Sequence, residues 1–96
     1  MVREICILMV EPAQTKEFEK MHADVVTVLR RQPGYHSDKL LAAREVSGQY
    51  VLMVEWDSVE AHQKFIDSND YPLMSGPYGK FVKDSSFAHY TSVVES

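Results

Sequence analysis

The stretch YVLMVEWDSVEAHQKF, residues 50–65, joins a strand to a helix and contains the only tryptophan of the chain. Its apolar, β-branched first half predicts a buried strand that ends at Trp56. Asp57 and Glu60 follow with the three-residue spacing of a capping box, which predicts the start of a helix. His62 therefore falls in the first turns of that helix, where the positive end of the helix dipole lowers the pKa of an imidazole.

The remaining sequence predicts three more strands and one more helix. The first helix is indicated by apolar residues at spacings of three and four, namely Phe18, Met21, Val25 and Leu29. Two prolines and two glycines in residues 68–80 predict an irregular segment with at most a short helical turn. The predicted strands are residues 2–10, 35–44, 50–56 and 86–94, and the predicted helices are residues 15–31 and 57–67.

The order β-α-β-β-α-β is that of a ferredoxin-like α+β fold with a four-stranded antiparallel sheet, in one domain over residues 1–96. The first and third strands are nearly continuous apolar runs, as expected of central strands, whereas the second and fourth are mixed, as expected of edges. Two helices cover only one face of such a sheet. The other face must meet a ligand or a partner sheet, so we expect a homodimer that packs through its sheet faces.

The composition of the chain argues against several classes of binding partner and cofactor. The net charge of −4 argues against nucleic acid and against an anionic membrane surface, because both attract basic proteins. Cys6 is the only cysteine, so no internal disulfide can form, and its apolar neighbours indicate a buried small side chain. The histidines lack the close spacing of a metal pair, so no metal is expected. The short apolar run near the N-terminus predicts neither a signal peptide nor a membrane span, so we expect a cytoplasmic protein.

A family resemblance lies in PGYHSDKLLAAREVSGQYVLMVEWDSVEAHQKFIDSNDY, residues 33–71. This order of a PG turn, a strand, a hairpin, a strand ending in E-W and an E-A helix resembles the antibiotic biosynthesis monooxygenase-like domains of the dimeric α/β-barrel superfamily. The likeness covers about residues 2–94 in order and length. It implies a dimer whose sheets pack face to face, with a cavity between each sheet and its helices. The second helix and the following loop would form the mouth of that cavity.

The oxygenase branch of this family implies specific residues. Trp56 matches the strand-end tryptophan of oxygenases that act on aromatic polyketides. An asparagine expected four residues earlier is Leu52 here, and a tyrosine expected six residues after the tryptophan is His62. The sequence thus agrees with the oxygenase branch at Trp56 and departs from it at Leu52. His62 could perform the proton transfer that the tyrosine performs in that branch.

Two other branches match less well. The proximal histidine of the haem-degrading enzymes falls at Ser75, their helix tryptophan falls at Phe65, and their first-strand asparagine is absent, so haem is not expected. In the polyketide cyclase branch, a helix tyrosine falls at Phe65, a loop histidine at Tyr71 and a first-strand histidine at Glu4. The acid and base pairing of that branch is therefore not reproduced.

Our leading interpretation is a cofactor-independent monooxygenase-like enzyme for a small hydrophobic aromatic substrate, phenolic or polyketide-like. His62 would be the base or proton shuttle, Trp56 a stacking wall and Tyr71 a polar contact at the mouth. The alternatives are a cyclase or isomerase that transfers protons, and a non-catalytic ligand-binding dimer in which Trp56 is a core anchor and His62 faces solvent. The residues expected to contact the substrate are Phe65, Met21, His22, Met53 and Tyr78. The sequence leaves open which strand residues, odd or even, face the cavity.

Overall fold

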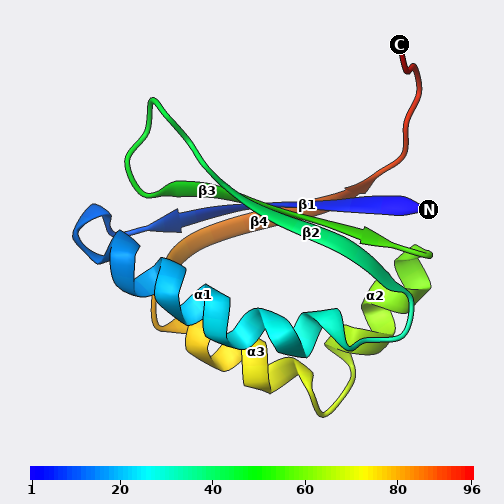
Figure 1. The fold of residues 1–96 in the computed structure, drawn as a ribbon, viewed down its shortest axis with the longest axis horizontal. Helices are drawn as coiled ribbons and strands as arrows, with labels where there is room; N and C mark the ends of the chain where they lie inside the picture. The colour runs from blue at the N-terminus through cyan, green and yellow to red at the C-terminus, as the bar shows by residue number, and fades with distance from the viewer.

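The computed structural model describes residues 1–96 as a four-stranded antiparallel sheet with all its helices on one face (Figure 1). A short 3-10 turn, η1, precedes the first helix and occupies Pro12–Gln14. The strands are β1 (Val2–Val10), β2 (Tyr35–Ala42), β3 (Gln49–Trp56) and β4 (Val82–Tyr90), and the helices are α1 (Thr15–Arg30), α2 (Val59–Ile66) and α3 (Tyr71–Gly79). None of the helices combines the length and the apolar character that crossing a membrane requires.

The strand order is β2-β3-β1-β4, which confirms the predicted ferredoxin-like arrangement. The two apolar strands, β1 and β3, are central, and the two mixed strands are edges. The register places Cys6 opposite Leu52 on one side and opposite Phe87 on the other. In the same way Glu4 lies opposite His89 of β4, so the first and last strands bring distant parts of the chain together.

The sheet has one buried face and one open face. Along β1 and β3 the even-numbered residues face the helices, and Leu8, Val10, Val54 and Trp56 among them are almost fully buried. The odd-numbered residues face the other way and are exposed or only half-buried. The sequence could not show whether the odd or the even residues face the helices, because both sets are apolar. In the structure the helices cover the side to which the even-numbered residues point.

Two of the helices differ from the prediction in their bounds or caps. Ser58, not Asp57, caps α2, because its Oγ accepts the N–H of Ala61 at 3.1 Å. The segment predicted to be irregular contains α3, a nine-residue helix. Pro72 is compatible with this helix because it lies in the first turn, where backbone N–H groups have no partner within the helix.

The buried face of α1 also differs. Phe18 and Leu29 are buried as predicted, but His22 and Val26 complete the stripe in place of Met21 and Val25, which are half-buried. The residues of this stripe follow one another mostly at four-residue steps, and one of them is a histidine. A search for apolar residues alone does not identify it. A polar side chain therefore lies within the layer between α1 and the sheet.

The last strand begins and ends four residues earlier than predicted. Its register with β1 runs from Arg3 opposite Tyr90 to Val10 opposite Val82. Pairing therefore ends at the beginning of β1, and the apolar residues Val93 and Val94 extend beyond the sheet into solvent.

Candidate functional site

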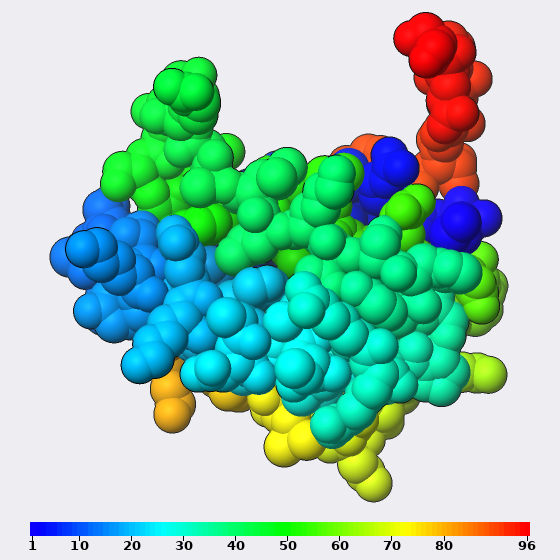
Figure 2. Space-filling view, viewed as in Figure 1, coloured from blue at the N-terminus to red at the C-terminus, as the bar shows by residue number.

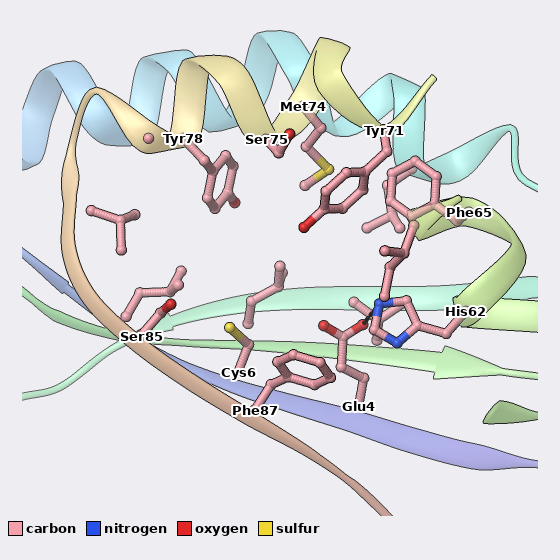
Figure 3. Close-up of a pocket in the computed structure, with 17 residues that line it drawn as sticks. Glu4, Cys6, His62, Phe65, Tyr71, Met74, Ser75, Tyr78, Ser85 and Phe87 are labelled. Carbon is pink, nitrogen blue, oxygen red and sulfur yellow. Dashed lines mark ion pairs between the residues drawn. The ribbon is translucent and has the colours of Figure 1, made fainter. Parts of the chain in front are cut away.

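A cavity of about 340 Å³ lies between the helix-facing side of the sheet and helices α2 and α3 (Figure 3). Most of its lining is hydrophobic, and its volume falls in the range of small-molecule sites. The exposed members of the lining are Gly79 of α3 and Ser85 and Phe87 of β4, so the cavity opens between the last helix and the edge strand.

Glu4 is the one carboxylate in the cavity wall. It is only 8% exposed, because its position in a central strand points it under the helices. Burial raises the pKa of its carboxyl, while the hydrogen bond from Trp56 acts in the opposite direction. Trp56 Nε1–H donates to Oε1 at 3.0 Å, and no protein group bonds to Oε2. Glu4 therefore offers the cavity a carboxyl oxygen with a raised proton affinity.

His62 lies beside Glu4 and also lines the cavity. Its Nε2 is 3.3 Å from Glu4 Oε1, and its Nδ1 is 2.8 Å from His89 Nε2. Burial, and secondarily the nearby His89, lower the pKa of His62 to about 4, so the imidazole is neutral at physiological pH. The contact with Glu4 is thus one between a carboxyl and a neutral ring.

Trp56 supports this pair from behind. It is fully buried and does not line the cavity, so it lies in the core and not in a wall that a ligand touches. Its indole stacks on the His62 ring at a centroid distance of 5.1 Å and an angle of 17°. The strand end thus fixes both the carboxylate, by a hydrogen bond, and the imidazole, by stacking.

Two tyrosines of α3 reach into the cavity from the opposite side (Figure 3). Tyr71 packs edge-on against Phe65, with ring centroids 5.3 Å apart, and its hydroxyl points into the cavity. The hydroxyl of Tyr78 lies 2.5 Å from Nδ1 of the buried His22. Burial raises the pKa of Tyr78 and lowers that of His22, so both groups are neutral near pH 7.

The structure separates the remaining expected ligand contacts from the cavity. Met53 is an odd-numbered residue of β3 and lies on the open face of the sheet, which corrects the expectation that it lines the cavity. Met21 is half-buried on α1 and is also absent from the wall. His22 lies behind Tyr78 and reaches the cavity only through that tyrosine.

The sequence profile of the antibiotic biosynthesis monooxygenase family matches residues 1–72 of this chain. The chain belongs to that family. Its resemblance to these domains, inferred from residues 33–71, is therefore confirmed.

Individual proteins also resemble this chain in sequence or in structure. The uncharacterized protein YczJ of Bacillus subtilis (strain 168) is 31% identical over 72 residues, which cover 74% of this chain and 76% of YczJ. A Bordetella bronchiseptica protein described as an antibiotic biosynthesis monooxygenase superimposes with a TM-score of 0.91 at 25% identity over 97% of both chains. SnoaB, a cofactor-independent oxygenase from Streptomyces nogalater, superimposes with a TM-score of 0.85 at 22% identity over 98% of this chain and 94% of SnoaB.

The cavity wall departs at Leu52 from what the family resemblance implies. Leu52, at the position where the oxygenase branch is expected to carry asparagine, lines the cavity together with Ser75. No group of three or more His, Cys, Asp or Glu side chains is arranged to hold a metal ion. Glu4 and His89 were not among the residues expected from the sequence. A signal for Glu4 existed, because a carboxylate within a central strand needs buried partners.

Proposed function

We propose that this family member is a cofactor-independent monooxygenase that acts on a small, hydrophobic aromatic substrate of phenolic or polyketide-like type. The observation that carries the proposal is the buried carboxyl of Glu4, which has a raised pKa and a free oxygen at one side of a largely apolar cavity. A flat apolar molecule suits the lining, and a carboxylate of raised pKa suits the removal of a weakly acidic proton.

The proposed reaction begins with proton transfer from the substrate to Oε2 of Glu4. An anthrone serves as the example: loss of a proton from its methylene carbon gives an electron-rich anion, which transfers electrons to O₂ and forms a carbon–oxygen bond. The oxygen–oxygen bond then breaks as the second methylene proton leaves. The products are a carbonyl and one water molecule. The methylene carbon is oxidised by four electrons and O₂ is reduced by four, so no external reductant is needed.

The roles expected from the sequence change in two respects, at His62 and at Trp56. His62 Nδ1 is hydrogen-bonded to His89 and its Nε2 lies beside Glu4, so we assign proton removal to the Glu4–His62 pair, with Glu4 in contact with the substrate. Trp56 would hold the carboxylate in place from the core, since it does not line the cavity. Tyr71 would give a polar contact to a substrate oxygen, because its hydroxyl points into the cavity.

The test is oxygen uptake with anthrone and with 1,4-dihydroxynaphthalene, measured with an oxygen electrode and corrected for uptake without protein. We expect Glu4→Gln to lower kcat by a factor of about 10² to 10⁴, the usual contribution of a general base. Glu60→Gln is the matched control, because Glu60 is exposed on α2 and outside the cavity. His62→Ala, in protein that is still folded, should also lose activity. Uptake that survives in Glu4→Gln would reject the assigned base.

Proton-transfer chemistry without oxygen is the second candidate, and Leu52 favours it. Leu52 puts an apolar side chain in the wall where oxygenases of the branch are expected to carry asparagine. A cyclase or isomerase would still need Glu4 to remove a proton from an enolisable carbon. Deuterium exchange at the substrate methylene without oxygen uptake would favour this candidate. Saturable binding with neither uptake nor exchange would favour a non-catalytic ligand-binding protein.

We also propose that a second copy of this chain covers the open face of the sheet. Ile7 and Leu41 are 42% and 47% exposed there, beside the half-buried Ile5, Val51 and Met53. Such a contiguous apolar face is typical of an interface. The β2–β3 hairpin and the C-terminal tail both project on this side, and a partner sheet would lie between them (Figure 2).

Light scattering should give twice the mass of the chain, and Leu41→Lys should shift the protein toward the mass of one chain. Lys39→Gln on the same strand is a control that adds no charge to the apolar face. A wild-type mass of a single chain at micromolar concentration would reject the dimer. The cytoplasmic location remains a prediction from the sequence.

A further inference from the structure

A line of three polar side chains runs from the cavity to the edge of the sheet. It begins at Glu4 on β1, passes through His62 on α2 and ends at His89 on β4, with the separations of 3.3 Å and 2.8 Å given above. His89 itself does not line the cavity, and its side chain is only partly buried. It therefore cannot touch a substrate in the cavity and can act only through His62.

The position of the His62 proton follows from its two neighbours. A neutral imidazole carries one N–H and one lone pair, and its surroundings decide which nitrogen has the proton. The Glu4 carboxylate favours the proton on the nearer nitrogen, Nε2, because a lone pair there would face a negative charge. Nδ1 then has the lone pair, and in that tautomer the hydrogen bond of 2.8 Å to His89 is one that His89 Nε2–H donates.

We propose that His89 is a positioning residue of this site: its N–H occupies the lone pair of His62 Nδ1, holds the proton of His62 on Nε2 beside Glu4, and keeps that imidazole from becoming a cation. A neutral neighbour matters for Glu4. An imidazolium at 3.3 Å would stabilise the carboxylate and weaken it as a base, whereas a neutral ring leaves its proton affinity high. The low pKa of His62 agrees with this arrangement.

The other titratable groups around Glu4 and His62 add no positive charge beside the Glu4 carboxyl. No lysine or arginine lines the cavity. Cys6, the neighbour of Glu4 on the same face of β1, has a pKa raised to about 11 by burial, and burial also raises the pKa of Tyr78 on α3. Tyr71 of α3 is the third titratable side chain across the cavity. The other residues of α2 and β4 that line it do not titrate, and they are Phe65, Ile66, Val82, Ser85 and Phe87. Glu4 is thus the one carboxyl group in the lining.

The test compares wild-type protein with His89→Leu and His89→Gln by nitrogen-15 NMR of the histidine rings and carbon-13 NMR of the Glu4 carboxyl. In wild-type protein we expect His62 to be in the Nε2–H form and to stay neutral down to about pH 4. His89→Leu removes the donor, so the pKa of His62 should rise by about one unit or more and that of Glu4 should fall. His89→Gln should restore wild-type values, because its amide N–H can replace the imidazole donor.

A kinetic readout rests on the proposed function. If Glu4 is the base, His89→Leu should lower kcat and move the acidic limb of the pH–rate profile to lower pH, and His89→Gln should restore both. The NMR readout needs no substrate, so it stands even if no activity is found. The proposal is overturned if wild-type His62 carries its proton on Nδ1, or if His62 and Glu4 titrate in His89→Leu as they do in wild type.

Discussion

The buried His62 makes a quantitative prediction about stability against pH. Its pKa is about 4 in the folded protein and 6.5 for the ordinary side chain. The unfolded chain therefore binds a proton at a pH at which the folded chain does not, and acidification favours unfolding. Each unit of pKa difference corresponds to about 1.4 kcal/mol, so the whole shift corresponds to about 3 kcal/mol. About 2 kcal/mol of this is lost between pH 7 and pH 5.

Glu4 must be removed from the comparison because it acts in the opposite direction. Its pKa is raised in the folded protein, so its contribution to stability increases as the pH falls. We therefore compare Glu4→Gln with Glu4→Gln/His62→Gln, since the amide oxygen of Gln still accepts from the indole of Trp56. Every other titrating group, including His89, is common to both chains.

The assay is urea unfolding near pH 7 and near pH 5 at a fixed protein concentration, followed by tryptophan fluorescence. Trp56 is the only tryptophan and is fully buried, so its emission reports the loss of this part of the core. On going to the lower pH, the single variant should lose about 2 kcal/mol more free energy of unfolding than the double variant. Equal losses in the two variants would show that His62 is not desolvated as described.

Three further outcomes are expected. Tyr78→Phe leaves the buried His22 without its hydrogen-bond partner and should lower the free energy of unfolding, measured with urea, by about 1–3 kcal/mol. The double variant Tyr78→Phe/His22→Leu should recover part of this loss, because it also removes the unpaired imidazole. Gly34→Ala should cost about 1–2 kcal/mol and lower the melting temperature, because Gly34 has φ of +84° and an added Cβ would lie 2.7 Å from the Cβ of Ala61. Cys6, with a pKa raised from 9.0 to about 11, should react with a disulfide reagent about a hundredfold more slowly than a free thiol, and a ligand in the cavity should slow it further.

The sequence predicted the sheet because burial leaves a strong pattern in a strand. The apolar runs of β1 and β3 follow from their central places, and the Pro33-Gly34 turn requires the positive φ that it has. Helix α3 was missed because its prolines and glycines are typical of loops. Its formation depends on packing, since Met74 is buried in the core beneath it.

The site was only partly readable for a different reason. His62 and Phe65 lie on α2, a helix that the sequence predicted, while Tyr71 and Tyr78 lie in the segment that the family resemblance places at the mouth of the cavity. All four line the cavity. Glu4 and its partners depend on strand parity and on register between strands far apart in the chain. Strand parity cannot be read from the sequence because both faces of the sheet are apolar. The register between β1 and β4 cannot be read either, because no local pattern encodes it.

The pairing of Glu4 with His89 across β1 and β4 also affects how the protein is made. During synthesis, Glu4 leaves the ribosome well before His89, so the cluster that they form with His62 cannot assemble until β4 has docked on β1. The same strand supplies Ser85 and Phe87 to the wall of the cavity. A chain in which β4 is undocked, whether nascent or nicked by a protease, would thus lack both the enclosed cavity and the cluster of Glu4, His62 and His89. The proposed activity, if measured, would therefore report completed folding.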